Sequence, residues 1–334
     1  MQNRPGITNK FIVVLLAIAT LSAACSSTGS NPKVSEAHLT GEWILFASDR
    51  SGNWDIYRMH SDGSSVRRLT GSMAYDWAPS FSPDGSQIAF SSNYLTGEVN
   101  ETGSVVDGEW VRESFEELQE QEIFLMDSDG NNLRALTDND LAVDNGPDWS
   151  PDGSQIVFYS DLNQMSVEIY SINVDGTGLQ QLTELGGNNW DPSWSPDGQQ
   201  IVFSSLLSEW LPYVMEADGS NLRFLEETGP GWKFSWSPSG DRIAFSSNRD
   251  GNWNIYVIDA DGTNVVQLTS DSTDEHDPVW SPSGQQIAFA ANKTGPFEIF
   301  IIDADGKSLV NNLADENVFA TGQAGFPSDW ARTP

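Results

Sequence analysis

Short stretches of β-branched and aromatic residues recur along the chain, and each is bounded by turn-forming residues. One stretch has the sequence Ile-Ala-Phe or Ile-Val-Phe and occurs at residues 88–90, 156–158, 201–203, 243–245 and 287–289. Another alternates polar with apolar residues, as in Trp-Asp-Ile-Tyr at 54–57 and Trp-Asn-Ile-Tyr at 253–256. Runs of this length and period predict short antiparallel strands joined by hairpins.

Two kinds of turn separate these predicted strands. Ser-Pro-Asp-Gly or Ser-Pro-Ser-Gly precedes the Ile-x-Phe stretch at residues 82–85, 150–153, 195–198, 237–240 and 281–284. An Asp-Gly turn follows the alternating stretch, and its glycines are Gly63, Gly130, Gly176, Gly219, Gly262 and Gly306. A further short piece then ends in Leu-Thr or a related pair. Proline restricts φ and glycine adopts positive φ, so both motifs suit tight turns. With the piece before the Ser-Pro turn, the Ile-x-Phe stretch, the alternating stretch and the final piece, each unit contains four predicted strands.

The spacing of the units predicts a closed ring. The serines of successive Ser-Pro motifs are 68, 45, 42 and 44 residues apart, and a period in the forties is typical of β-propeller blades. Residues 43–46 have the pattern of a second strand, whereas residues 326–330 have that of a first strand. The sequence therefore predicts an all-β, six-bladed propeller of four-stranded antiparallel blades over residues 41–334. Pairing of 326–330 with strands in 41–70 would close it and remove an unpaired edge.

The 68-residue interval contains an insertion of about 25 residues, which we place at residues 94–120. Within it, Val111, Phe115 and Leu118 have helical spacing, which predicts a short helix over residues 111–118. An insertion of this length suits either a functional element or a flap that covers a blade edge.

Residues 1–25 have the features of a targeting signal. Arg4 and Lys10 give a basic start, and the apolar run that follows is too short to span a bilayer comfortably. Leu-Ser-Ala-Ala precedes Cys25 and resembles a bacterial lipobox, although the leucine stands four positions before the cysteine instead of three. We expect lipid attachment at Cys25, with ordinary cleavage nearby as the alternative. Residues 26–40 predict a flexible tether.

The charge of the chain limits the classes of partner. It has 48 Asp and Glu residues against 16 Lys and Arg residues, for a formal net charge of −32. Such a field repels nucleic acid and anionic membrane surfaces, so the expected membrane contact is through the lipid anchor only. It attracts cations or a basic partner, although an acidic surface also serves solubility or salt adaptation. Cys25 is the single cysteine of the chain, so packing must hold the fold together without disulfides.

Candidate binding residues lie at the start of each predicted first strand. In a four-stranded blade, the loops between second and third strands and the connections between blades emerge on one face. The residues expected at the mouth on this face are Asp76, Trp77, Asp144, Asn145, Trp190, Asp191, Trp232, Lys233, His276 and Asp277. Carboxylates with interleaved aromatic rings suit a cation, a sugar or a basic peptide. For any single aspartate, capping of the strand is the simpler role.

The sequence contains no recognisable catalytic set. It has three histidines, no Gly-x-Ser-x-Gly nucleophile turn and no zinc-ligand spacing. Ser195 and its counterparts recur in every Ser-Pro turn, which indicates a turn residue. Acidic pairs such as Asp127 and Asp129 suggest calcium, but they lack the later ligands of a calcium loop and are explained by turn formation. We therefore expect no enzymatic activity, no metal and no cofactor.

Three parts of the repeat carry a resemblance to a known family: the Asp-Pro-Ser-Trp-Ser-Pro-Asp-Gly unit at 191–198, the Ser-Asp-Arg-Ser-Gly-Asn-Trp-Asp-Ile-Tyr stretch at 48–57 and the Asp-Gly…Leu-Thr ending. With these parts, the repeat closely resembles that of the TolB-type (WD-repeat-like) β-propeller family. The resemblance runs from about Gly41 to Trp330. It implies a propeller of the bacterial cell envelope, periplasmic or associated with the outer membrane, that binds a protein or peptide. We expect this propeller to be a monomer. The α/β domain that precedes the propeller in TolB has no expected counterpart here.

Two functions are consistent with the sequence. The first is a non-enzymatic envelope scaffold that binds a protein or peptide through the face bearing the insertion. The alternative is a carbohydrate-binding or carbohydrate-cleaving envelope protein that uses the tryptophans and carboxylates of the same mouth.

Overall fold

The computed structural model describes residues 41–94, 103–106, 109–112, 121–139, 142–207, 210–293, 297–312 and 325–332. The predicted signal, the predicted tether and the expected lipidation at Cys25 lie outside the described residues. Within the described ranges, no helix has the length and apolar character needed to cross a membrane.

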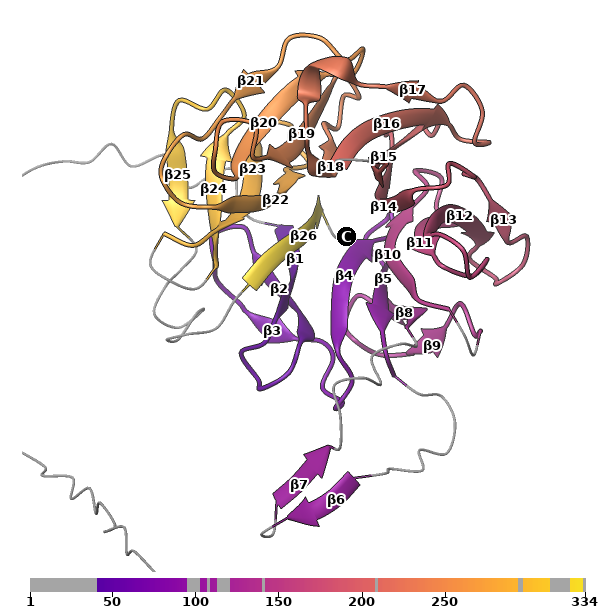
Figure 1. The fold of residues 1–334 in the computed structure, drawn as a ribbon. Coiled ribbons are helices and arrows are strands. Elements are labelled where there is room, and N and C mark those ends of the chain that lie inside the picture. The colour runs from indigo at the N-terminus through magenta and orange to yellow at the C-terminus, as the bar shows by residue number, and fades with distance from the viewer. Residues whose placement is uncertain are drawn as a thin grey trace, which may run out of the picture. The chain divides into compact units, whose positions relative to one another are not determined.

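Six four-stranded antiparallel sheets surround a common axis, as predicted (Figure 1). Each sheet is one blade, and we name it by its innermost strand. The innermost strands are β4 (Asp76–Phe81), β10 (Asp144–Trp149), β14 (Asn188–Trp194), β18 (Trp232–Trp236), β22 (Glu275–Trp280) and β26 (Gly325–Arg332). The second strands are β5 (Gln87–Ser92), β11 (Gln155–Ser160), β15 (Gln200–Leu206), β19 (Arg242–Ser247), β23 (Gln286–Ala291) and β1 (Glu42–Ser48).

The outer half of each blade consists of a longer third strand and a short edge strand. The third strands are β8 (Glu122–Asp127), β12 (Glu168–Asn173), β16 (Trp210–Glu216), β20 (Asn254–Asp259), β24 (Glu298–Asp303) and β2 (Asp55–His60). The edge strands are β9 (Arg134–Ala135), β13 (Gln180–Gln181), β17 (Arg223–Phe224), β21 (Val266–Gln267), β25 (Leu309–Asn312) and β3 (Arg67–Arg68). A short 3-10 helix, Glu226–Thr228, follows β17. Edge strands this short offer little template for pairing with another chain.

The ring closes by pairing of β26 with β1, which confirms the predicted closure. The strand order of this blade is β26-β1-β2-β3, with β26 antiparallel to β1. Trp330 lies opposite Ile44 and Asp329 lies opposite Leu45. Innermost strands also contact those of the neighbouring blades, including β26 with both β22 and β4. Strands from the two ends of the described chain therefore complete one sheet.

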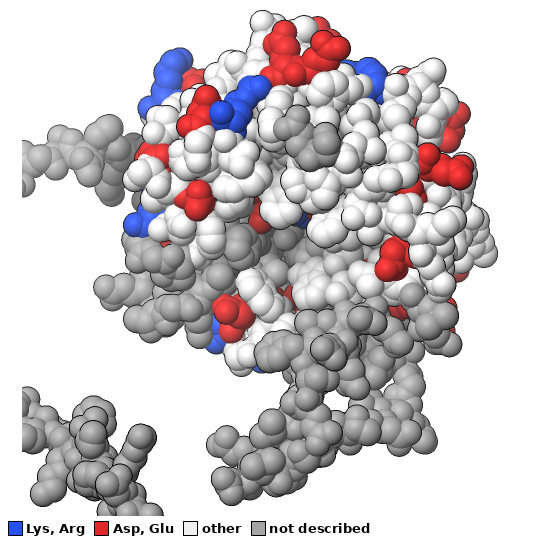
Figure 2. All heavy atoms as spheres, in the orientation of Figure 1, with Lys and Arg blue, Asp and Glu red and all other residues white. Residues whose placement is uncertain are grey.

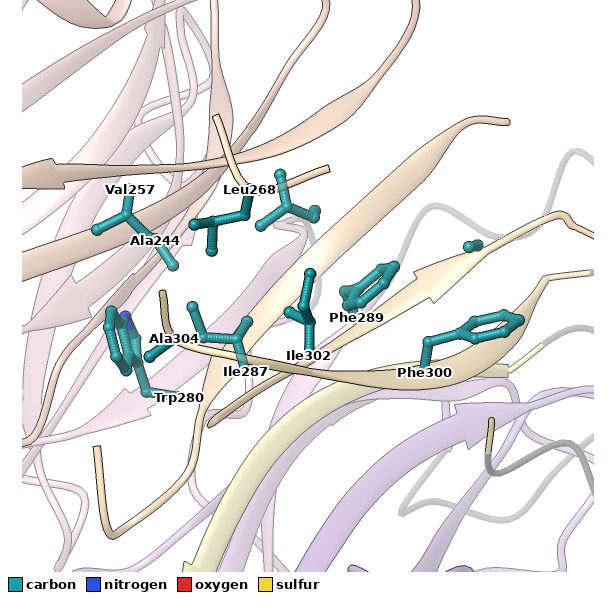
Figure 3. Close-up of a cluster of buried hydrophobic side chains, with 11 residues drawn as sticks. Ala244, Val257, Leu268, Trp280, Ile287, Phe289, Phe300, Ile302 and Ala304 are labelled. Atoms are coloured by element: carbon teal, nitrogen blue, oxygen red, sulfur yellow. The ribbon is translucent and has the colours of Figure 1, made fainter. Parts of the chain in front are cut away.

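The hydrophobic core lies between the blades. Figure 3 shows one interface, where Trp280, Ile287 and Phe289 of the β22 blade pack against Ala244 and Val257 of the β18 blade. The phenylalanine of each Ile-x-Phe stretch is at most 1% exposed, and these residues are Phe90, Phe158, Phe203, Phe245 and Phe289. Burial of one such side chain contributes about 1.5–3 kcal/mol, so the repeated apolar stretches stabilise the stacking of blades.

The Ser-Pro turn is maintained by its serine, as the sequence predicts. Ser82 Oγ donates to Asp84 Oδ1 at 2.6 Å and accepts the backbone N–H of Gln87 at 2.9 Å. Gly85 has a φ of 69° and donates its N–H to the carbonyl of Ser82 at 2.7 Å. Hydrogen bonds from Ser82 and Ser86 lower the pKa of Asp84 to about 2. Ser150 and Ser195 make both contacts, and Ser237 and Ser281 accept the equivalent N–H, so these serines define blade geometry.

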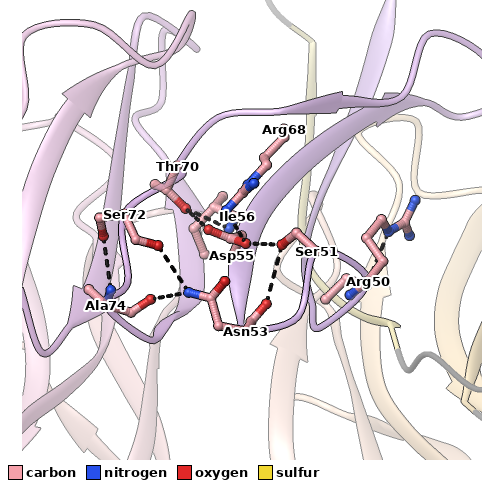
Figure 4. Close-up of polar contacts among 10 residues, drawn as sticks. Arg50, Ser51, Asn53, Asp55, Ile56, Arg68, Thr70, Ser72 and Ala74 are labelled. Atoms are coloured by element: carbon pink, nitrogen blue, oxygen red, sulfur yellow. Dashed lines mark hydrogen bonds and ion pairs between the residues drawn. The ribbon is translucent and has the colours of Figure 1, made fainter. Parts of the chain in front are cut away.

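The recurring Leu-Thr pair joins the fourth piece of the unit to the third strand (Figure 4). Thr70 Oγ1 accepts the N–H of Ile56 at 3.0 Å and donates to Asp55 Oδ1 at 3.4 Å, while Arg68 forms an ion pair with Asp55 at 2.7 Å. Thr137, Thr183 and Thr269 accept the equivalent N–H in other blades. In three of these blades the threonine also donates to an acidic residue at the start of the third strand, namely Asp55, Glu122 or Glu168, which anchors the edge of the blade.

The insertion contains a β-hairpin, and the prediction of a helix over residues 111–118 is wrong where it can be checked. β6 (Gly103–Val106) pairs with β7 (Glu109–Arg112), with Val111 opposite Ser104. β-Branched and aromatic residues around the turn favour cross-strand pairing, and three apolar residues are too few to distinguish a helix from a strand. Residues 113–118 lie outside the described residues.

Closure predicts that removal of residues 325–334 abolishes cooperative unfolding of the whole propeller, because β1 would lose its inner partner. The Trp330→Ala variant should lose about 3–5 kcal/mol of stability, since this indole is only 4% exposed in the core. Thermal and urea unfolding followed by circular dichroism measure both effects. Met165→Ala is the control, because its side chain is 88% exposed and should change stability little. A truncated protein that melts like the full chain would contradict this closure.

Candidate functional site

Each innermost strand contains an irregularity that turns side chains toward the axis. Pairing with the second strand shifts register between Trp77 and Ser80, and at equivalent places in the β10, β14, β18 and β22 blades. In five of the blades the residue at the start of the bulge has a left-handed backbone, namely Ala78 (φ 49°), Gly146 (62°), Asp191 (52°), Lys233 (53°) and Asp277 (54°). Bulges re-aim side chains, and non-glycine residues held in this conformation often mark functional sites.

The bulges surround a cavity of about 480 Å³ on the axis of the ring. Residues of all six innermost strands line it, together with Ala47, Trp54 and Tyr159. The charged residues of its lining are Asp148, Asp191, Lys233, Asp277 and Asp329. Figure 2 shows acidic and basic atoms inside the hollow at the centre of this face. The cavity is therefore polar and predominantly acidic.

Lys233 is the cation among these lining residues, and it is held by the acidic residues around it. Its Nζ lies 2.9 Å from Asp191 Oδ1 in an ion pair whose side chains are 36% and 9% exposed. Burial lowers the pKa of Lys233, but attraction to Asp191 and Asp277 outweighs burial, and the pKa is raised. Burial raises the pKa of Asp277 to about 6, despite the opposing effect of Lys233.

Asp148 and Asp329, which both line the cavity, link neighbouring blades. Asp148 accepts the backbone N–H of Trp194 at 2.7 Å and the hydroxyl of Ser80 at 3.2 Å. Asp329 accepts the backbone N–H of Phe81 at 2.6 Å. Burial raises the pKa of Asp148 to about 7 and that of Asp329 to about 6. These carboxyls therefore stabilise the ring while they contribute to the acidity of the cavity.

A continuous row of aromatic side chains, which we call the aromatic arc, extends across four neighbouring blades. Its successive members are Tyr159, Trp190, Trp210, Trp232, Trp253, His276 and Phe297, with ring centroids 5.2 to 6.2 Å apart. Every member is partly exposed. A Cβ atom at Gly146 would lie 2.7 Å from the ring of Tyr159, so this glycine gives the arc room at that point.

The structure brings together some of the sequence-predicted site residues and separates others. Trp77, Asn145, Trp190, Asp191, Trp232, Lys233 and Asp277 line the cavity. Asp76 is buried and accepts the hydroxyl of Ser92 at 2.5 Å, and Asp144 is buried and accepts the amide of Asn139 at 2.7 Å. His276 lies in the aromatic arc instead of the cavity lining. Asp76 and Asp144 are therefore engaged by nearby side chains and do not belong to the lining of the cavity.

Sequence reasoning missed Asp148, Asp329 and Trp210. Asp148 and Asp329 occupy equivalent positions in their blades, immediately before the buried Trp149 and Trp330. Alignment of the repeats on those tryptophans would have revealed this equivalence. Trp210 lies in the divergent stretch of the β14 blade, where the repeat is hard to align. Pairing of Phe203 with Tyr213 and of Phe245 with Tyr256 makes Trp210 equivalent to Trp253.

In the described part of the chain, no three His, Cys, Asp or Glu side chains come together in a way that could hold a metal ion.

Comparison with known proteins assigns the family. A family model described as the TolB beta propeller domain matches residues 105–231 and 229–325, which together cover most of the chain. The chain belongs to the TolB β-propeller domain family. A TolB homologue from Chlorobium luteolum is 32% identical over 140 residues, which represent 36% of this chain and 32% of that protein. The chain spans about a third of the length of the curated relatives that it matches.

Solved structures of low sequence identity share the propeller fold. The structure of TolB from Acinetobacter baumannii matches with a TM-score of 0.66 at 20% identity. The match covers 88% of this chain and 67% of that protein. An oligogalacturonate lyase in complex with manganese matches with a TM-score of 0.53 at 14% identity. That match covers 81% of this chain and 74% of the lyase chain. At these identities the likeness concerns the fold alone, and an enzyme is among the proteins that share it.

The buried carboxyls predict that the protein is more stable at pH 5.5 than at pH 8. Burial raises the pKa of six carboxyls to about 6 or 7, namely Asp76, Glu122, Asp148, Glu275, Asp277 and Asp329. An acid with a raised pKa binds its proton more tightly in the folded state, so its contribution to stability is lost as pH rises through that pKa. The lowered pKa of His276 acts in the opposite direction, but it is a single group.

We expect the melting temperature to fall by about 3 °C or more between pH 5.5 and pH 8 at constant ionic strength. The Asp148→Asn variant should show a smaller fall, because it removes one titrating carboxyl and keeps a side-chain acceptor for the N–H of Trp194. Asp84→Asn is the matched control, since the pKa of Asp84 lies far below this range. Equal or greater stability at pH 8 would contradict the prediction.

Proposed function

We propose that this protein is a non-enzymatic binding scaffold of the cell envelope that recognises a segment of a protein or peptide through the mouth of the propeller. Membership of the TolB β-propeller domain family supports this proposal. The proposed location in the envelope rests on the signal-like residues 1–25. The proposed attachment to the membrane is through a lipid at Cys25 and a tether at residues 26–40. The proposed protein is a monomer attached to a periplasmic or outer-membrane surface, and nucleic acid is not a proposed partner.

The observation that carries the proposal is an acidic cavity beside a partly exposed aromatic arc, both supported by a rigid ring. A volume of about 480 Å³ accommodates one or a few side chains, so a projecting segment fits better than a whole folded surface. The aromatic rings provide large apolar contact area and lose little conformational entropy on binding. The carboxylates favour a segment of basic character.

The engagement of the carboxyls supports a binding role over a catalytic one. Asp148 and Asp329 accept backbone N–H groups of neighbouring blades, and Asp191 is paired with Lys233. A general acid or base must exchange protons with a substrate. The carboxyl oxygens that would do so here are already engaged in these structural contacts. The arrangement therefore uses its acidic side chains to hold the ring and to set the charge of the cavity.

The aromatic arc also bears on the carbohydrate alternative. Sugar rings stack on open aromatic faces. Trp190 and Trp210 meet at an interplanar angle of 67°, and Trp210 and Trp232 meet at 60°. Rings at such angles cover part of one another's faces, which leaves less flat surface for a sugar than for side chains of a peptide. For this reason we favour a protein or peptide.

The proposal predicts that substitutions at the mouth reduce partner capture without unfolding the protein. Full-length protein would be used to capture proteins from envelope extracts of the organism that produces it. The double variant Trp232→Phe/Asp277→Asn should recover at least about tenfold less of a specific partner, because both an aromatic contact and a negative charge are reduced. A second variant that lacks residues 97–118 tests the insertion.

Variants outside the cavity lining serve as matched controls. Trp43→Phe and Asp84→Asn change an indole and a carboxyl away from the cavity lining, and both should capture the partner at the wild-type level. Melting temperatures verify that every variant is folded. If all captured proteins bind the mouth variants and the wild type equally, the proposal is wrong.

A further inference from the structure

The aromatic arc offers rings to a cation, and the chain itself supplies none over its central members. Within the described residues, no Lys or Arg is positioned over Trp190, Trp210 or Trp232. These three rings are partly exposed and belong to the β14 and β18 blades. The central part of the arc is therefore an apolar surface accessible to a group from outside the chain.

The chemistry of such contacts is visible elsewhere in this protein. The guanidinium of Arg58 lies 4.4 Å from the ring centre of Trp43, and that of Arg242 lies 4.9 Å from the ring of Trp280. Arg50 lies over the ring of Tyr57 at 4.7 Å. A planar guanidinium stacks on aromatic faces and is weakly hydrated, so it loses less on leaving water than an ammonium group does.

The charge beside the arc complements a guanidinium. Trp190 and Trp232 are each followed directly by a bulge residue, Asp191 and Lys233 respectively, and Asp277 is the bulge residue of the next blade. Lys233 neutralises Asp191 through their ion pair, which leaves Asp277 as the second carboxyl near this cation. Asp329, and Asp148 above its pKa of about 7, add further negative charge to the same cavity. A positively charged side chain on the central rings would thus face an acidic cavity.

Resting on the proposed function, we infer that the bound segment is anchored by an arginine side chain, whose guanidinium lies among the central rings of the arc, Trp190, Trp210 and Trp232, stacks on the open face of one of them and faces the carboxylates of the cavity. An extended peptide with this arginine in its middle fits the mouth. The aliphatic part of the side chain contacts the indoles, and the charged end is directed toward Asp277. Arginine is preferred over lysine because only the guanidinium combines stacking with directed hydrogen bonds to a carboxylate.

Three matched peptides test this anchor on the full-length protein. They are acetyl-Gly-Pro-Arg-Pro-Gly-amide and the same peptide with lysine or with citrulline in place of arginine. Citrulline keeps the planar shape and removes the charge. We expect the arginine peptide to bind about tenfold more tightly than the citrulline peptide and about threefold more tightly than the lysine peptide. Tryptophan fluorescence and protein-detected NMR titrations measure the dissociation constants, and higher salt should weaken binding of the arginine peptide.

Variants separate the arc from the remainder of the surface. Trp210→Leu removes a central ring and keeps an apolar side chain, and Asp277→Asn removes a charge, so each should weaken the arginine peptide about threefold to tenfold. Trp43→Phe should leave its affinity unchanged. Equal binding of the arginine and citrulline peptides, or no binding of the arginine peptide, would overturn the inference. Partner capture that depends on the mouth would in that case still support the proposed function, whereas capture that ignores the mouth would refute that function by itself.

Discussion

The antiparallel pairing of β26 with β1 is the constraint on which the remaining structure depends. A propeller blade buries its apolar faces only against its two neighbours, so a ring with one incomplete blade leaves two interfaces poorly supported. The pairing also positions Asp329, whose carboxylate holds the N–H of Phe81 in the next blade. Closure of the ring and formation of the cavity are therefore consequences of the same contact.

The sequence predicts most of the fold because the information for it is local and repeated. Ser-Pro-Asp-Gly turns depend on one serine, one proline and one glycine, and Ile-x-Phe stretches depend on burial of a single phenylalanine. The closing strand could be predicted from the incomplete units at the two ends of the pattern. The hairpin at β6 and β7 was missed because residues 103–112 are outside the repeat, so only a few apolar positions were available to choose between a helix and a strand.

The candidate site was predicted only in part because side-chain direction in the innermost strands depends on a bulge. Without the bulge, side chains would alternate strictly between the two faces of the strand, and the direction of the first side chain would fix the direction of all the others. The extra residue shifts that alternation within the strand. As a result Asp144 points into the blade and is buried, whereas Asp148 of the same strand contributes to the cavity. Trp210 was missed for a different reason, since only strand pairing reveals its equivalence to Trp253.

The position of β26 also has a consequence for biosynthesis. β1 and its inner partner are separated by almost the whole propeller sequence, so the sheet edge of β1 stays open until β26 is available to pair with it. Such a long sequence separation also slows the final folding step. Asp329 reaches the cavity only in that step. A polypeptide released before β26 would lack part of the acidic lining, and its exposed edge would make it a substrate for quality-control proteases.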